Sequence, residues 1–338
     1  MLNKEKNILF RFIDAINPYF WITWLRNMAF DYQIIKSHTF DIPTISIGNI
    51  TVGGTGKTPH AELVIGELLK QNHRVALISR GYGRSSRGFR VVQEGDNYRD
   101  VGDEPLQIKR KFPSVLVAVD SSRKRAIDAL LAFPEDKRPS IIVLDDAFQH
   151  RRVVPSVSIV LVNYQRPVFQ DRLLPLGKLR DLPRRISAAD IVIVTKIPWY
   201  DESPDEALWR KKLHLSADQK LHFSKVEYGD FLPVFPQECD TRYVYSPKAI
   251  VFSGIANGRP FSDYVGVKYK AEALFRFSDH KNYRKCHIRR IESASAQFPT
   301  AAVITTEKDA QRLLHLKFIP EELKRKLLYL PMKIDIIK

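Results

Sequence analysis

Cysteine is scarce in this chain of 338 residues, which contains only Cys239 and Cys286. The two form no Cys-x-x-Cys pair, so neither a disulfide framework nor a zinc site is expected, and a reducing, cytosolic setting is favoured. Long apolar runs are missing as well, which argues against a membrane-spanning helix of about twenty apolar residues. A cleaved signal peptide is not expected, because Asp14 and Pro18 interrupt the apolar N-terminal stretch.

Acidic residues are in deficit. Asp and Glu number 38 against 54 Lys and Arg, which gives a formal net charge of +16 at pH 7. This excess indicates an anionic partner, and charge alone does not choose among nucleic acid, an anionic membrane surface and a phosphorylated substrate. The hydrophobic fraction of 44% suffices for a packed core. The length suggests two domains, or one large α/β unit with an appendage.

A glycine-rich loop ending in Gly-Lys-Thr follows an apolar, β-branched stretch at residues 44–50. Residues 58–70 then show helical spacing of apolar side chains, which completes the strand, loop and helix of a phosphate-binding loop. Backbone N–H groups of such a loop point at phosphate oxygens, and the helix N-terminus adds positive potential. We expect Lys57 to reach the β- and γ-phosphates and the Thr58 hydroxyl to hold Mg²⁺. The residues predicted to bind the nucleotide are Thr51, Val52, Gly53, Gly54, Thr55, Gly56, Lys57 and Thr58.

The loop departs from the strict phosphate-loop pattern at its first position, where Thr51 stands in place of glycine. Its Gly-Gly-Thr-Gly-Lys-Thr form is closer to the variant loop of partition-type ATPases. Those proteins carry an extra lysine where this chain has Val52. A partition-type P-loop ATPase with an anionic polymer partner such as DNA therefore stands as the alternative function.

A second apolar stretch, residues 141–144, ends in two carboxylates, Asp145 and Asp146. A buried strand that delivers aspartate to the carboxyl edge of a sheet is the expected metal-side partner of a phosphate loop. We therefore predict that Asp145 and Asp146, together with Thr58, hold the metal ion.

Short apolar strands alternate with helical stretches through the first two thirds of the chain. This pattern predicts an α/β fold, a P-loop NTPase parallel sheet with helices on both faces. Thr195 and Lys196 occupy the place where GTPases carry Asn-Lys-x-Asp, but the aspartate position is Pro198. We therefore favour ATP over GTP.

The pattern changes after the last of these strands, and we divide the chain accordingly. Residues 37–222 are the predicted P-loop kinase core. Alternating stretches at 223–236 and 326–338 are expected to pair as a two-stranded linker. The linker would carry a smaller C-terminal α/β lobe formed by residues 237–325.

Residues 1–36 form a region of predicted amphipathic helices, one of them starting at Asn17 and Pro18, which read as a cap and a first-turn proline. Its aromatic residues are Tyr19, Phe20, Trp21, Trp24, Phe30 and Tyr32. Two interpretations remain open. The aromatic face packs against the kinase core, or it lies in a membrane interface, where aromatic and basic side chains are common.

Seven motifs occur in the order typical of one family, tetraacyldisaccharide 4′-kinase, the lipid A 4′-kinase of Gram-negative bacteria. They are residues 51–59, 79–83, 102–105, 144–150, 174–180, 278–280 and 305–309. The chain resembles this family over nearly its whole length. The ordered set is specific, although no single motif decides the question.

The resemblance implies ATP-dependent phosphorylation of the 4′-hydroxyl of a tetraacylated disaccharide 1-phosphate by a peripheral enzyme on the cytoplasmic face of the inner membrane. It implies that Asp103 and His280 form a catalytic base dyad. By itself Asp103 would be read as a helix N-cap before Pro105. The family's Leu-Arg-Glu-Pro is replaced here by a sequence with Asp181, which has a shorter carboxylate arm and a shifted proline. Because Asp103 and His280 fall in different lobes, the dyad requires the lobes to approach each other.

Four further residues are candidates for contacts with the substrate or its phosphate: Arg80, Gln149, His150 and Arg180. The expected small molecules are ATP, Mg²⁺ and the lipid A disaccharide 1-phosphate. An anionic membrane surface is the expected macroscopic partner, with no nucleic acid, and a monomer is favoured.

Overall fold

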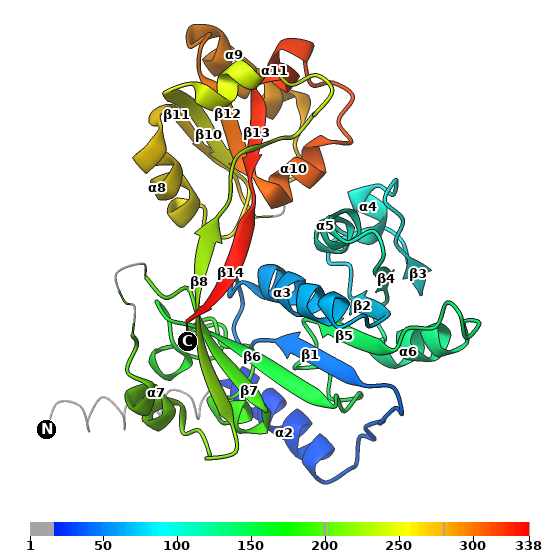
Figure 1. Ribbon diagram of the computed structural model, residues 1–338. Coiled ribbons are helices and arrows are strands. Elements are labelled where there is room, and N and C mark those ends of the chain that lie inside the picture. Colours follow the sequence, from blue (N-terminus) through cyan, green and yellow to red (C-terminus); the bar gives the residue numbers. More distant parts are fainter. Residues whose placement is uncertain (1–16, 199–200, 202, 280, 338) are drawn as a thin grey trace, which may run out of the picture.

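The computed structural model describes residues 17–198, 201, 203–279 and 281–337 (Figure 1). Its larger part is built on a nine-stranded sheet with the order β14-β8-β7-β6-β1-β5-β2-β4-β3. The strands are β1 (Thr44–Gly48), β2 (Val75–Ser79), β3 (Arg90–Val91), β4 (Leu116–Val119), β5 (Ile141–Asp145), β6 (Val157–Asn163), β7 (Ile191–Thr195), β8 (Lys220–Tyr228) and β14 (Met332–Ile337). Neighbouring strands are parallel, except that β3 pairs antiparallel with β4 and β14 antiparallel with β8. The predicted parallel sheet is confirmed.

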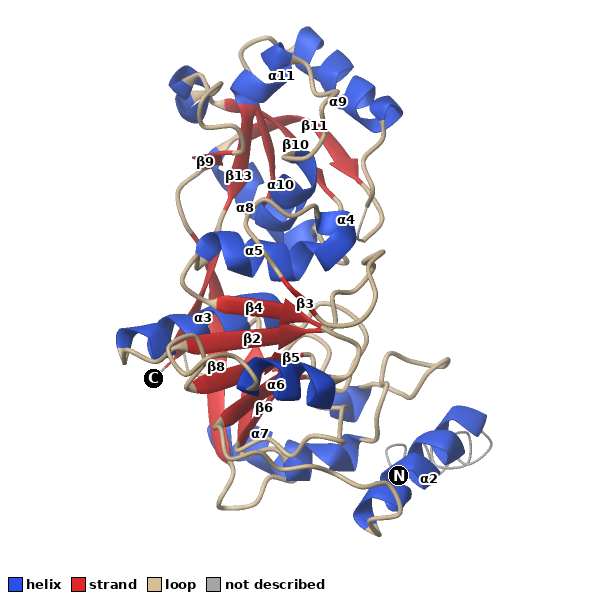
Figure 2. Ribbon diagram, turned by 90° about the vertical axis from the view of Figure 1, so that its right-hand side faces the viewer, coloured by secondary structure: helices blue, strands red, loops and turns tan. Residues whose placement is uncertain are grey.

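Helices cover both faces of this sheet (Figures 1 and 2). On one face lie α3 (Lys57–Lys70) and α5 (Asp103–Lys111), and on the other lie α2 (Pro18–Asp31), α6 (Arg123–Leu131) and α7 (Glu206–Leu213). The short α4 (Tyr98–Val101) precedes α5, and 3₁₀ turns occur at Val168–Gln170, Pro183–Ala188 and Thr241–Tyr245. Strand β5 shows why two layers are needed. Ile141 and Val143 pack toward α3, whereas Ile142 and Leu144 pack toward α6, because alternate side chains leave a strand on opposite sides.

A second, five-stranded sheet has the order β11-β10-β12-β13-β9. Its strands are β9 (Leu232–Pro233), β10 (Lys248–Ser253), β11 (Lys270–Arg276), β12 (Ala302–Thr306) and β13 (Leu327–Leu330). The helices around it are α8 (Arg259–Lys268), α9 (Lys285–Gln297), α10 (Glu307–Leu313) and α11 (Glu321–Lys326). We call this part the small lobe, and the part built on the nine-stranded sheet the large lobe.

Strands β8 and β14 connect the two lobes, as the green and red strands of Figure 1 show. They pair in an antiparallel register that joins Tyr228 to Met332 and Phe223 to Ile337. The predicted linker stretch 326–338 does not form one strand, because only β14 pairs with β8 and the residues before it form β13. Pro331 has no N–H to continue a ladder, and the chain before it turns into β13 of the small lobe.

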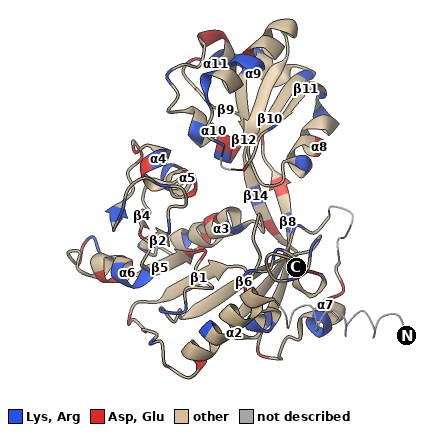
Figure 3. Ribbon diagram, turned by 180° about the vertical axis from the view of Figure 1, so that it is seen from behind, with Lys and Arg blue, Asp and Glu red and all other residues tan. Residues whose placement is uncertain are grey.

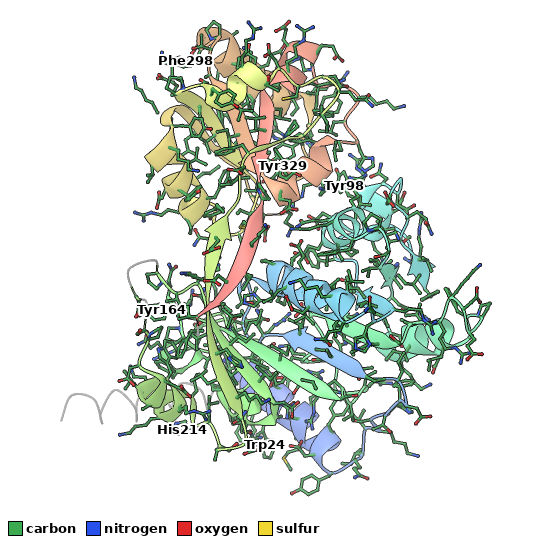
Figure 4. The ribbon with its side chains drawn as sticks, viewed as in Figure 1. Trp24, Tyr98, Tyr164, His214, Phe298 and Tyr329 are labelled. Atoms are coloured by element: carbon green, nitrogen blue, oxygen red, sulfur yellow. The ribbon has the colours of Figure 1, made fainter. Side chains whose placement is uncertain are left out.

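The small lobe lies against the large lobe along α5 and α10. The Arg110 guanidinium on α5 donates to Gln311 Oε1 at 2.7 Å. The Tyr98 hydroxyl donates to Asn282 Oδ1 at 3.0 Å, and Figure 4 shows Tyr98 on the edge of α4 nearest the small lobe. Among the described residues, no helix combines the length and apolar character needed to cross a membrane.

Candidate active site

The phosphate loop joins β1 to α3 with two glycines in the left-handed region, Gly53 at φ 100° and Gly56 at φ 89°. Most side chains avoid these angles, so the loop depends on glycine there. The start of α3 has no side-chain cap, which leaves its first N–H groups available to an anion. Two backbone bonds hold the loop against residues 174–180: Val52 N donates to Lys178 O at 2.7 Å, and Arg180 N donates to Ile50 O at 2.8 Å.

Two cations converge on Asp146, directly after β5. Lys57 Nζ lies 3.8 Å from Asp146 Oδ1, and the Arg180 guanidinium donates to both carboxylate oxygens. Burial works to raise the pKa of Asp146, but Lys57 and Arg180 hold it below its ordinary value. Arg180 also donates to Asn49 Oδ1 at 2.6 Å. The structure thus brings the predicted Arg180 to the phosphate loop.

Asp145 is buried and has a different environment from its neighbour. Ser79 Oγ donates to Oδ2 at 3.0 Å, whereas Oδ1 has no hydrogen-bond partner among the described residues. Burial raises the pKa of Asp145 to about 6, and the charges of Glu104 and Asp146 act in the same direction. An unpaired carboxylate oxygen beside a second carboxylate is a site that a divalent cation would stabilise.

No cluster of three or more His, Cys, Asp or Glu side chains suited to a metal occurs in the described part of the chain. A phosphate-loop enzyme does not need one, since Mg²⁺ is held by one or two carboxylates together with substrate phosphates. The donors present, Asp145, Asp146 and the Thr58 hydroxyl on the first turn of α3, are hard oxygen ligands and fit Mg²⁺.

Asp103 begins α5, directly after Gly102. Gly102 (φ 95°) and Gly81 (φ 67°) let the loops after β2 and α4 pack backbone against backbone, since a Cβ on Gly102 would lie 3.1 Å from Gly81 Cα. The Asp103 carboxylate is buried, and its Oδ1 accepts from Glu104 N at 2.9 Å. Asp103 is the first helical residue rather than the N-cap that its sequence alone suggested, because Gly102 occupies that position.

The other carboxylate oxygen of Asp103 faces the small lobe. Arg312 Nε donates to Oδ2 at 3.0 Å, and Arg312 Nη2 donates to the same oxygen at 2.5 Å. Lys308 Nζ is 4.0 Å from it. The family motif at residues 305–309 includes Lys308, but sequence reasoning assigns neither cation a role toward Asp103. Thr306 caps α10, and its side chain accepts a hydrogen bond from Asp309 N. The predicted dyad partner His280 lies outside the described residues.

The remaining substrate candidates lie near the carboxyl ends of β2 and β5. Arg80 is exposed immediately after β2. Burial, followed by the charge of Arg123, lowers the pKa of His150 to about 4, and the charge of Arg80 adds to this effect. Gln149 O accepts from the Arg26 guanidinium at 2.5 Å. Lys and Arg positions are otherwise spread along the ribbon of both lobes (Figure 3).

A pocket opens beside the phosphate loop, lined by its residues 51–55 and by Asn163, Lys196, Ala256 and Asn257, among others. The last two come from the small-lobe loop after β10, so both lobes contribute to it. Lys196 Nζ donates to Gly54 O at 2.5 Å, and burial lowers its pKa. The residue at the lysine position of the GTPase motif therefore contacts the phosphate loop here.

Helix α2 begins at Asn17 and Pro18 as predicted, and one of its faces packs on the large lobe through Tyr19, Phe20 and Trp24. Trp21, Ile22 and Leu25 are exposed on its other face, by 47%, 64% and 58%. The buried interpretation of the aromatic residues is therefore right for only one face of the helix.

The loop that carries Arg180 is tied to α2. Tyr19 OH donates to Arg180 O at 3.0 Å, and Asn27 Nδ2 donates to Asp181 Oδ1 at 2.8 Å. Asp181 is 1% exposed, and its carboxylate anchors α2 through the bond from Asn27.

The model of the tetraacyldisaccharide-1-P 4′-kinase family matches residues 15–338. The chain belongs to this family. A tetraacyldisaccharide 4′-kinase of Parabacteroides distasonis is 41% identical over 315 residues, which cover 91% of this chain and 85% of that relative. One from Flavobacterium johnsoniae is 37% identical over 332 residues, which cover 98% and 93%. The protein is thus a kinase of lipid A biosynthesis, and the partition-type alternative falls away.

The architecture agrees with this family. The crystal structure of LpxK from Aquifex aeolicus in complex with ATP superposes with a TM-score of 0.71 at 25% identity. The match covers 99% of this chain and 95% of that one, so both lobes and the strands that join them are included.

Proposed function

We propose that this kinase transfers the γ-phosphoryl group of ATP to the 4′-hydroxyl of tetraacyldisaccharide 1-phosphate. The observation that carries the proposal is a pair of charged side chains at the phosphate loop together with a buried carboxylate at the start of α5. Lys57 and Asp146 lie 3.8 Å apart, and the neighbouring loop after β2 supports a buried carboxylate, Asp103. The names of the relatives and the ATP bound by LpxK from Aquifex aeolicus support the same donor and acceptor.

The donor end of the site neutralises charge. Apart from Val52, whose N–H is bonded to Lys178 O, the N–H groups of the loop and of the start of α3 bind the phosphates, and Lys57 contacts the β- and γ-phosphates. Arg180, whose guanidinium is already beside Lys57 and Asp146, adds positive charge where the transferred group becomes more negative. Phosphoryl transfer depends chiefly on such positioning and electrostatic stabilisation.

Thr58, Asp145 and Asp146 would hold Mg²⁺. When bound, the ion would offset the negative charge of the phosphates. The unpaired Oδ1 of Asp145 supports this role. Arg180 partly neutralises Asp146, so of the two carboxylates Asp145 is the one that has an oxygen available to bind the ion.

Asp103 acts as the general base toward the acceptor. Its carboxylate accepts the proton of the 4′-hydroxyl as the oxygen forms its bond to the γ-phosphorus and the bond from phosphorus to the β–γ bridging oxygen breaks, which releases ADP. His280 orients Asp103 and shares the proton. Arg80, Gln149 and His150 contact the sugar or its phosphate. All these roles are expected from the family motifs and from the positions of the described residues.

The acceptor carries acyl chains and sits in a bilayer, so the site must approach a membrane surface. The exposed face of α2, formed by Trp21, Ile22 and Leu25, has the apolar character of an interfacial helix. Its opposite face is tied to the Arg180 loop. We infer that this face contacts the cytoplasmic side of the inner membrane and that the enzyme is a peripheral monomer.

We assign a separate role in the reaction to each of the predicted domains. Residues 1–36 associate with the membrane, the core at 37–222 binds ATP, and the lobe at 237–325 supplies groups that face Asp103. The predicted linker, whose connecting strands are β8 and β14, keeps the two parts in one chain while allowing them to close on a substrate.

Replacing Asp103 tests the mechanism. Asp103→Asn keeps the size of the side chain but removes its basicity, so kcat for lipid phosphorylation should fall by roughly a hundredfold or more, with ATP affinity within about twofold of wild type. Asp100→Asn is the matched control, since Asp100 lies three residues away and accepts a hydrogen bond from Ser85 Oγ. Near-normal turnover in Asp103→Asn would remove Asp103 from the base role.

A further inference from the structure

Arg312 is the largest fully buried side chain in the described structure, at 1% exposure. Its Nη1 is fixed within the small lobe, where it donates to Gly254 O at 2.8 Å and to Asp309 Oδ1 at 2.7 Å. Burying a guanidinium is costly unless its donors are matched by acceptors. The small lobe therefore holds a preformed binding site for the Arg312 guanidinium. We call its acceptors, Gly254 O and Asp309 Oδ1, the seat of Arg312.

The seat itself is held by several hydrogen bonds. Asp309 Oδ1 also accepts from Tyr283 OH at 3.0 Å, and Asp309 Oδ2 accepts from Gly254 N at 2.8 Å and from Thr306 Oγ1 at 2.7 Å. With both oxygens occupied, Asp309 cannot rotate without losing several bonds. Arg312 is thereby fixed in direction before it meets the large lobe.

The two remaining donors of Arg312, Nε and Nη2, both reach across the lobes to Asp103 Oδ2. The backbone N–H of Glu104 holds Oδ1, so both oxygens of Asp103 have donors and its torsion is set. Burial works to lower the pKa of Arg312, but Asp309 and Asp103 raise it above its ordinary value. The guanidinium thus stays charged beside the carboxylate.

Simple docking of the lobes does not require this arrangement, because other pairs cross the same boundary. Arg110 reaches Gln311, and Lys308 Nζ contacts Glu104 Oε1 at 2.9 Å. These contacts are more exposed than the Arg312 pair and do not depend on a prepared seat. The feature that distinguishes Arg312 is its target, the carboxylate that we assign as the base.

We propose that Arg312 is a positioning residue that keeps Asp103 ionised and aimed, so that the base is complete only when α10 lies against α5. This inference rests on the proposed role of Asp103. It adds that the small lobe contributes to turnover through the Arg312 guanidinium and its seat, in addition to His280. Closing of the lobes on a substrate then also prepares the base.

The test compares Arg312→Gln with Arg110→Gln, which crosses the same boundary without touching Asp103. We expect Arg312→Gln to lower kcat by about tenfold or more, with KM for ATP within about twofold. The acidic limb of the kcat–pH profile should move up by about one pH unit, because Asp103 loses a cation; Lys308 and Glu104 also face it and remain. Arg110→Gln should leave that limb in place, and Arg312→Lys should recover part of kcat.

Two results would overturn the inference. One is an equal loss of kcat in Arg312→Gln and Arg110→Gln with no movement of the acidic limb, which would make Arg312 a docking residue only. The other, decisive if Arg312→Gln does not fold, is wild-type kcat and pH profile in Arg312→Lys, whose single ammonium cannot copy the two-donor contact. Asp103→Asn keeps the outcomes apart. If Asp103→Asn is active, Asp103 is not the base, and both the proposed role of Asp103 and this inference fail. If Asp103→Asn is inactive and Arg312→Gln behaves like the wild type, only this inference fails.

Discussion

Lowering the pH from 7 to 4 should destabilise this protein through one buried histidine, His60. The residue lies on the first turn of α3 and is 2% exposed. Its Nδ1 is 2.7 Å from Gly56 O, and its Nε2 is 2.9 Å from Ser224 Oγ on β8. A carbonyl oxygen only accepts, so Nδ1 carries the proton and Nε2 accepts from the Ser224 hydroxyl. Because burial lowers its pKa to about 4, the imidazole is neutral at pH 7, and it joins the phosphate loop to a strand of the linker.

Burial sets the size of the effect. It lowers the pKa of His60 from 6.5 to about 4, while the hydrogen bond to Gly56 works weakly the other way. Between these values the unfolded chain binds a proton that the native protein does not, so stability falls as the pH drops through 6.5 toward 4. At about 1.4 kcal/mol per pH unit the loss reaches about 3 kcal/mol, a large share of a typical net stability of roughly 5–15 kcal/mol.

Urea unfolding at pH 7 and pH 4 of wild type and His60→Gln measures this loss. A variant is needed because Asp145, whose pKa is raised to about 6, contributes a slope of opposite sign. The free energy of unfolding of the wild type, taken relative to that of His60→Gln, should fall by about 3 kcal/mol from pH 7 to pH 4. His222→Gln, which removes an exposed histidine of β8, is the control. A difference that does not change with pH would refute the neutral, buried state of His60.

Two further predictions follow from the site and from α2. Burial raises the pKa of Asp145 to about 6, and only the ionised carboxylate binds Mg²⁺. The Mg²⁺ concentration for half-maximal activity should therefore rise steeply below pH 6. At pH 7.5, Asp145→Asn should require far more Mg²⁺ than the wild type. The double change Ile22→Ser and Leu25→Ser should weaken binding to anionic vesicles in a flotation assay. Val267→Ser changes an 86% exposed residue of the small lobe and is the control. An equal loss of vesicle binding in both variants would show that α2 has no special role.

The features that are local in sequence could be predicted. The strand, glycine loop and helix at residues 44–70 follow from apolar spacing and from the glycines that permit positive φ. Asp145 and Asp146 follow from a buried strand that ends in charge. The start of α2 at Asn17 and Pro18 is likewise encoded in adjacent residues.

Contacts between distant segments could not be predicted in the same way. Arg312 reaches Asp103 across 209 positions, and His60 reaches Ser224 across 164. Both contacts depend on how the lobes and strands pack, and single residues such as these carry no periodic signal. Residues 305–309 illustrate the limit, because the motif is visible in the sequence, whereas the contact made by Arg312 on the next turn of α10 is not.

Transfer of labelled γ-phosphate to lipid tests the central claim most directly. The full-length protein is incubated with γ-labelled ATP, Mg²⁺ and tetraacyldisaccharide 1-phosphate in mixed micelles, and the position of the new phosphate in the lipid is determined. The account predicts label at the 4′-oxygen, formed by the wild type and lost with Lys57→Ala. Label released only as inorganic phosphate, or attached at another position of the disaccharide, would contradict it.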